Sequence, residues 1–205
     1  YLYRNNYTKP IAVASVPSSN YSKLLNITIN CINNGVDLDS FNSSLQLKKR
    51  KIDFLCVGRF VPIKNQMFIL KLIKKYYMNS NTNFCFLGDG PLLEECKAYV
   101  KENHIPNVSF EGFVDDGNRY MANSKVLLMP SLNEGNPMVV NEALASGMMV
   151  VGSDVGGIHD LLVNLENCFL CEVNNEDSFY LAMERCLKTI KAEDVVFNVK
   201  KSDYS

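Results

Sequence analysis

The chain has 205 residues, which is enough for one domain or for one domain and a fragment of another. Its hydrophobic content of 47% and its charged content of 21% are ordinary for a globular protein in water. The formal net charge of −1 gives no sign of a nucleic-acid partner, so we expect none.

The first 40 residues differ in composition from the rest of the chain. A short strand is predicted over residues 11–15 (IAVAS). The segment after it is rich in Asn and Ser and ends in the turn-like NNGVD at residues 33–37. We interpret residues 1–40 as the remnant of a preceding domain and a linker. The N-terminal YLYRNNYTKP has no apolar signal core and no starting Met, so we expect the chain to begin within a longer protein.

From about Lys51 onward, strand patterns and helix patterns alternate with short links between them. Six short apolar strands are predicted, over residues 52–58, 83–88, 108–114, 125–131, 148–153 and 167–173. Helices are predicted over residues 65–77, 115–124, 136–147, 156–163 and 176–190. A further helix is predicted to open at Gly90-Pro91, with Leu93, Cys96 and Val100 on one face. Apolar strands without polar alternation fit a parallel sheet that helices cover on both faces. We therefore predict a doubly wound α/β (Rossmann-like) domain over residues 41–192, followed by a tail over residues 193–205.

Unusual residues follow the predicted strand ends throughout this domain. They are Gly58-Arg59, Gly88-Asp89-Gly90, Gly112, Pro130 to Glu134 and Ser153 to Gly157. Ligands of doubly wound sheets bind beyond the carboxyl ends of the strands, where all these residues are expected to meet. The convergence predicts a single ligand site at that edge.

The seven cysteines are spread through predicted strands and helices. Cys56 and Cys85 lie in apolar strand patterns, so we expect them to be small buried hydrophobic residues. Cys168 and Cys171 form a CxxC inside another strand, where alternation would point them to opposite faces. Because no second Cys pair or His pair stands at a zinc spacing, we expect no metal site and no cofactor.

The strongest signal is residues 130–157, PSLNEGNPMVVNEALASGMMVVGSDVGG. Two carboxylates, Glu134 and Glu142, flank the start of a predicted helix, where Asn136 is expected to cap and Pro137 suits the first turn. A helix N-terminus offers N–H groups and positive dipole charge to phosphate. Carboxylates accept hydrogen bonds from sugar hydroxyls. The segment therefore indicates a ligand with both kinds of group, such as a nucleotide-sugar.

The motifs INNGVD, GRFVPIKN, FLGDGP, EGFV and the long segment above occur in the order seen in one family. From about Ile32 to Leu187, the chain resembles retaining glycosyltransferases of the GT-B fold, above all glycosyltransferase family 4 ("glycosyl transferases group 1"). The resemblance implies the C-terminal, donor-binding half of a GT-B fold. It implies a hexosyltransferase that moves a hexose-type sugar from a UDP- or GDP-linked donor to a hydroxyl of a glycan or glycolipid, with retention. Such enzymes act in capsule, O-antigen and other polysaccharide biosynthesis, and whether this fragment is active alone stays open.

The resemblance also assigns roles to individual residues. Arg59 and Lys64 match the family's basic pair that neutralises the donor diphosphate, and the loop after the first strand suits that contact. Glu134 and Glu142 match its paired glutamates, with Glu134 on the donor sugar and Glu142 on the ribose. Arg59, Lys64 and Glu134 are the expected catalytic residues. The other expected donor contacts are backbone positions at strand ends and around the helix start: Gly58, Gly88, Gly90, Gly112, Gly135, Asn136, Pro137, Met138 and Val139.

Several alternatives stay open. Asn136 stands where the family often has Phe or Leu, which leaves the donor identity open. Apart from its remnant in residues 1–40, the N-terminal acceptor domain is expected to lie outside this chain, so a non-catalytic nucleotide-sugar-binding module is one alternative. A GT-B nucleotide-sugar epimerase is another.

Expected partners are the nucleotide-sugar donor and a glycan or lipid-linked acceptor. Basic clusters at residues 47–51 and 71–77 are interpreted as solvated surface, with contact to phospholipid as the alternative. We expect a cytoplasmic protein and leave open a peripheral place at the inner face of the cell membrane. No apolar run approaches the roughly 20 residues of a membrane span.

Overall fold

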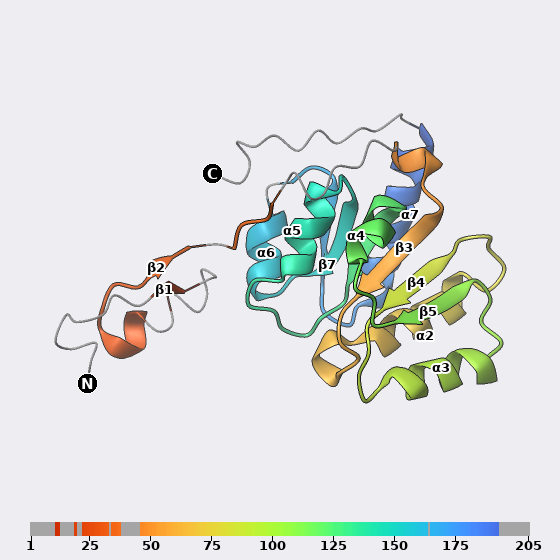
Figure 1. Ribbon diagram of the computed structural model, residues 1–205, viewed down its shortest axis with the longest axis horizontal. Helices are drawn as coiled ribbons and strands as arrows, with labels where there is room; N and C mark the ends of the chain where they lie inside the picture. Colours follow the sequence, from red (N-terminus) through yellow and green to blue (C-terminus); the bar gives the residue numbers. More distant parts are fainter. Residues whose placement is uncertain are drawn as a thin grey trace.

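The computed structural model describes residues 11–12, 19, 22–32, 34–37, 46–163 and 165–192. Its first part holds two short strands, β1 (Ile11–Ala12) and β2 (Asn30–Cys31), which pair in parallel. Figure 1 shows this pair lying apart from the central sheet. The sequence predicted β1 but not β2. The remainder of the strand expected over residues 11–15, and the tail over residues 193–205, lie outside the described residues.

Six parallel strands form the central sheet, in the order β5-β4-β3-β6-β7-β8. Their bounds are β3 (Ile52–Val57), β4 (Phe84–Leu87), β5 (Val108–Gly112), β6 (Ser124–Met129), β7 (Met149–Ser153) and β8 (Cys168–Cys171). The chain first builds one side of β3 with β4 and β5, and then crosses to the other side for β6, β7 and β8. The predicted doubly wound sheet is therefore confirmed, and its topological switch point lies between β3 and β6.

Helices cover both faces of this sheet (Figure 1). One face carries α2 (Gln66–Tyr76), α3 (Leu93–Glu102) and α7 (Glu176–Ala192), and the other carries α4 (Gly117–Ala122), α5 (Met138–Ala145) and α6 (Gly156–Leu162). Alternation along β3 explains the two cores, because Phe54 is buried in the first and Leu55 in the second. Cys168 and Cys171 also pack against different cores, as the alternation predicted.

All seven cysteines are free thiols. Cys56 and Cys85 are buried in β3 and β4 as predicted, and burial raises the pKa of the Cys56 thiol to about 12. Within the described ranges, no group of three or more His, Cys, Asp or Glu residues could hold a metal ion. No helix in the described part of the chain is long and apolar enough to cross a membrane.

The basic run before β3 departs from its prediction as solvated surface. It contains the short 3-10 helix η3 (Leu47–Lys49), and its three lysines are exposed as expected. Arg50, by contrast, is only 4% exposed, and its guanidinium donates hydrogen bonds to the carbonyls of Ser124 (2.9 Å) and Ser146 (2.7 Å). Burial lowers the pKa of Arg50 to about 10, which leaves it charged at neutral pH. The prediction is wrong for Arg50 because these buried carbonyls, at the start of β6 and the end of α5, need a donor that water does not supply.

Candidate functional site

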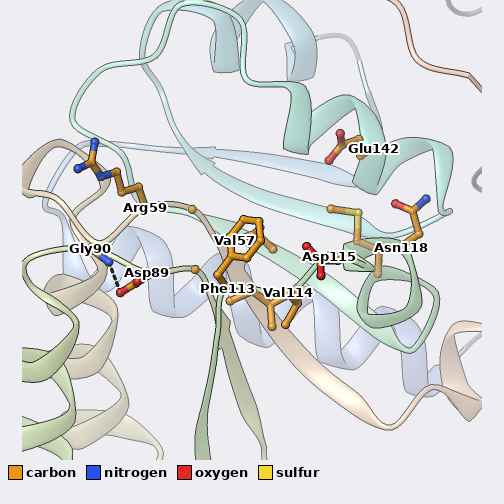
Figure 2. A pocket seen from close by; sticks show the side chains of 14 residues that line it. Val57, Arg59, Asp89, Gly90, Phe113, Val114, Asp115, Asn118 and Glu142 are labelled. Atoms are coloured by element: carbon orange, nitrogen blue, oxygen red, sulfur yellow. Dashed lines mark hydrogen bonds between the residues drawn. The ribbon is translucent and has the colours of Figure 1, made fainter.

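A cavity of about 670 Å³ opens at the carboxyl ends of the strands, beside the switch point. Its walls come from the loops after β3, β4 and β5, from α4 and from one residue of α5. Of the predicted site residues, it brings together Gly58, Arg59, Gly88, Gly90 and Glu142 (Figure 2). Of the strand-end residues that the sequence expected to meet, those after β3 and β4 line this cavity, whereas Gly112, Pro130 to Glu134 and Ser153 to Gly157 do not.

The glycines of this wall let two loops pack backbone against backbone. A Cβ on Gly88, whose φ is +129°, would lie 2.1 Å from the carbonyl oxygen of Gly58. A Cβ on Gly90, whose φ is +152°, would lie 2.5 Å from the carbonyl oxygen of Phe60. Only glycine fits both the backbone angle and the space. Gly112 joins the same framework, since its carbonyl accepts a hydrogen bond from the Gly88 amide (2.7 Å).

Arg59 stands at the rim of the cavity on a loop that is held in place. Its carbonyl accepts a hydrogen bond from the Gln66 side chain (3.0 Å), and the next amide, of Phe60, donates to the Asp89 carbonyl (2.9 Å). The side chain is exposed, and among the described residues no hydrogen bond or ion pair involves its guanidinium. Figure 2 shows it projecting above Asp89 and Gly90. A fixed backbone with a free guanidinium suits the capture of an anion that arrives from solvent.

Lys64 and Glu134, which the resemblance gave separate tasks, form one ion pair. The Lys64 ammonium lies 2.5 Å from Glu134 Oε1, and the Ser131 hydroxyl donates to the same oxygen at 2.8 Å. Both side chains are partly buried, with exposed fractions of 24% and 12%. Lys64 ends η4 (Pro62–Lys64), which a backbone hydrogen bond from Leu132 to Ile63 (2.8 Å) ties to the Glu134 loop. Neither residue lines the 670 Å³ cavity.

The Gly-Gly pair at the start of α6 supports the Glu134 loop from behind. The Gly157 amide donates to the Glu134 carbonyl (3.0 Å), and a Cβ on Gly157 would lie 1.8 Å from the Gly135 carbonyl oxygen. A Cβ on Gly156, whose φ is +42°, would lie 2.2 Å from the Glu134 carbonyl oxygen. The pair therefore lets a helix abut the loop that positions this carboxylate.

The start of α5 differs from its prediction. The helix begins at Met138 with Pro137 as its N-cap residue, and no side chain caps it, so the expected Asn136 cap is wrong. Pro137 takes the cap position because its backbone is extended (ψ 107°) while its carbonyl already accepts from the Val140 amide (3.0 Å). The first helical amides, of Met138 and Val139, have no carbonyl four residues back inside the helix. Five predicted donor contacts lie here and do not line the cavity: Gly135, Asn136, Pro137, Met138 and Val139.

Glu142 lies farther along α5 and faces the cavity from the α5 side (Figure 2). It is half-buried, and burial raises the pKa of its carboxyl group above the usual value. No hydrogen-bond or ion-pair partner of its carboxylate occurs in the described part of the chain. A desolvated carboxylate that faces a cavity gains from a ligand that donates hydrogen bonds.

Sequence reasoning missed three side chains on the opposite wall. Phe113, Asp115 and Asn118 follow β5 and line the cavity, and the Phe113 side chain is 77% exposed. The helix predicted over residues 115–124 starts with Asp115 and Asp116, which the sequence alone does not tell apart. In the structure Asp116 caps α4 by accepting from the Arg119 amide (3.2 Å), which leaves Asp115 to the cavity. The sequence signal that could have identified Phe113, Asp115 and Asn118 is their position directly after the predicted strand that ends at this edge of the sheet.

Comparison with solved structures identifies the fold. Anabaena Alr3699/HepE, crystallised with UDP and glucose, matches 90% of this chain and 54% of its own with a TM-score of 0.77 at 19% identity. Such neighbours are GT-B glycosyltransferases, so the α/β domain has the fold found in that class.

The sequence places the chain within a family. Residues 39–201 match the family described as "Glycosyl transferases group 1", and the chain belongs to it. An Escherichia coli UDP-Gal:alpha-D-GlcNAc-diphosphoundecaprenol alpha-1,3-galactosyltransferase is 30% identical over an alignment of 186 residues, which covers 83% of this chain and 47% of that protein. A Campylobacter jejuni N-acetylgalactosamine-N,N'-diacetylbacillosaminyl-diphospho-undecaprenol 4-alpha-N-acetylgalactosaminyltransferase is 28% identical over 175 residues, 82% of this chain and 47% of its own. The chain thus spans about half the length of these relatives.

Proposed function

We propose that this chain is the C-terminal, donor-binding half of a retaining glycosyltransferase of family 4. The enzyme would transfer a hexose-type sugar from a UDP- or GDP-linked donor to a hydroxyl of a glycan or glycolipid during polysaccharide biosynthesis. The observation that carries the proposal is that Arg59 and Glu142 both line one cavity of about 670 Å³ at the switch point of the sheet. A cation for the diphosphate and a carboxylate for the ribose lie where doubly wound folds bind nucleotides.

The proposed roles follow from the chemistry of each side chain. The bond between the sugar C1 and the diphosphate oxygen breaks while the acceptor oxygen attacks from the same face, and the acceptor proton leaves with the diphosphate. The charges of Arg59 and Lys64 favour the departing diphosphate, because charged donors bind phosphate oxygens strongly. The Met138 and Val139 amides add helix-terminal donors. Glu134 accepts hydrogen bonds from the sugar hydroxyls.

Most of the acceptor half is proposed to lie outside these 205 residues. The support is the length of the relatives, of which this chain covers about half. The β1–β2 pair, which lies apart from the main sheet, is then a candidate part of that domain. Because the names of two relatives refer to diphosphoundecaprenol-linked sugars, a lipid-linked acceptor is the favoured class. A cytoplasmic enzyme, peripheral at the inner face of the cell membrane, would reach such an acceptor.

Radiolabelled UDP- and GDP-sugars test the proposal on the purified chain. We expect saturable binding of a nucleotide-sugar that the Arg59→Ala substitution weakens, and transfer once the acceptor half and a lipid-linked acceptor are supplied. Binding with neither transfer nor hydrolysis, even with the acceptor half present, would favour a non-catalytic binding module. An epimerised sugar formed without any acceptor would overturn the transferase proposal in favour of an epimerase.

A further inference from the structure

We propose that the cavity selects guanine as the donor base, with the Asp115 carboxylate reading its edge and the Phe113 ring as its stacking surface. This inference rests on the proposed nucleotide-sugar function and narrows the donor to the GDP-linked class. It concerns the wall of the cavity that follows β5, to which the sequence assigned only a backbone contact at Gly112.

The geometry of the cavity places the base against this wall. Arg59 stands at the rim after β3, and Glu142 faces the cavity from α5. If Arg59 binds the diphosphate and Glu142 binds the ribose, the base of the nucleotide lies between these side chains and the loop after β5. Figure 2 shows Asp115 below Glu142, with the Phe113 ring between Asp115 and the Arg59 rim.

Phe113 has the properties of a stacking platform. Its side chain is 77% exposed at the cavity although Phe is among the residues most often buried. The other phenylalanine rings nearby stack on one another, as Phe86 and Phe110 do at 5.3 Å, whereas Phe113 has no ring partner within the described ranges. An aromatic face left open at a nucleotide cavity suits a base, because every base offers a π-face.

Asp115 supplies the choice between bases. An ionised carboxylate only accepts hydrogen bonds. Guanine offers it two adjacent donors, N1–H and the N2 amino group, which match its two oxygens. Uracil offers one donor, N3–H, between two carbonyl oxygens that repel a carboxylate, and adenine offers an amino group beside the acceptor N1.

The structure leaves the Asp115 carboxylate available for this task. It lines the cavity and is exposed, and no hydrogen bond or ion pair engages it among the described residues. Its neighbour Asp116, of identical chemistry, caps α4 through the Arg119 amide instead. The two aspartates therefore have different roles: Asp116 caps α4, and Asp115 faces the cavity.

Titration calorimetry of the 205-residue chain with GDP, UDP and ADP tests the inference. We expect GDP to bind about 10- to 100-fold more tightly than UDP, the range for one well-placed bidentate contact to a base. Asp115→Asn should remove the preference for GDP over UDP, because the acceptor and the donor of an amide match N1–H and O6 of guanine as well as N3–H and O4 of uracil. Asp116→Ser is the matched control, since it removes an equal charge one residue away and keeps a residue that caps helices well.

The outcomes separate the two proposals. A GDP preference that Asp115→Asn removes and Asp116→Ser keeps would support the guanine assignment. Tighter binding of UDP or ADP than of GDP, or a GDP preference unchanged in Asp115→Asn, would overturn that assignment and leave the nucleotide-sugar function in place. Binding of none of the three nucleotides would overturn both.

Discussion

Changing Glu134 to Gln removes a negative charge that lies 2.5 Å from the Lys64 ammonium. The amide oxygen of Gln still accepts the hydrogen bonds that Lys64 and Ser131 donate to Oε1. The substitution therefore keeps the local geometry and frees the ammonium from its counter-ion. If Lys64 meets the donor diphosphate, the variant should bind diphosphate more tightly than the parent.

The size of the gain follows from the distance. A phosphate oxygen bound on the far side of the ammonium would carry its charge about 5 Å from the Glu134 carboxylate. At an effective dielectric constant of about 20, two unit charges at about 5 Å repel by about 3 kcal/mol. The side chains are 24% and 12% exposed, so solvent and salt reduce this. We expect a gain of about 1–2 kcal/mol in diphosphate binding, or about 5- to 30-fold.

Titration calorimetry with inorganic diphosphate, at low and at high salt, measures the gain directly. Glu166→Gln is a suitable control, because Glu166 is exposed in the loop before β8 and its substitution changes the net charge equally. Transfer activity should fall in Glu134→Gln even as diphosphate binds better, since the sugar loses a charged acceptor. Equal or weaker diphosphate binding in Glu134→Gln than in Glu166→Gln would refute the idea that Lys64 meets the diphosphate.

Three further substitutions test separate parts of the molecule. Arg59→Ala should weaken nucleoside diphosphate binding by about 1.5–3 kcal/mol in calorimetry, and unchanged UDP and GDP affinities would remove Arg59 from the site. Glu142→Gln should raise the melting temperature at pH 7, because burial raises the pKa of Glu142 and so makes its ionised form unfavourable in the fold. The gain should shrink as pH falls through that pKa, where Glu142 becomes neutral by itself, and nucleoside binding should weaken more than inorganic diphosphate binding. Arg50→Met should lower the free energy of unfolding by about 3 kcal/mol in urea, because two carbonyls lose a charged donor, and an unchanged midpoint would contradict this.

The sheet was predictable because its strands are short apolar runs, and such runs by themselves indicate buried parallel strands. Phe54 and Leu55 are adjacent and both fully buried, as expected for a strand that is covered on two faces. The strand order was not predicted from the sequence; it comes from the structure, although right-handed crossovers leave few topologies for such a sheet. The ends of elements were less predictable, as at α5, where Pro137 and not Asn136 occupies the cap position.

The pairing of side chains within the site was not predictable, because it depends on contacts between residues that lie far apart in the sequence. Lys64 and Glu134 stand 70 positions apart, and their ion pair exists because η4 and the Glu134 loop are tied together. Arg50 looked like one of several solvated basic residues until the buried carbonyls around it were placed. The different roles of Asp115 and Asp116 depend on which of the two carboxylates reaches the Arg119 amide, a matter of backbone angles.

The two parts of the proposed donor site differ in how far they are preformed. The nucleoside cavity is fixed by backbone contacts that admit only glycine at Gly88 and Gly90, so a nucleotide can enter with little rearrangement. At the sugar end, Lys64 and Glu134 satisfy each other while no donor is bound. Under the proposed roles, a diphosphate that draws Lys64 away from Glu134 also releases that carboxylate to accept hydrogen bonds from the sugar. The ion pair then couples the two tasks, because the carboxylate becomes available to the sugar only when the diphosphate is in place.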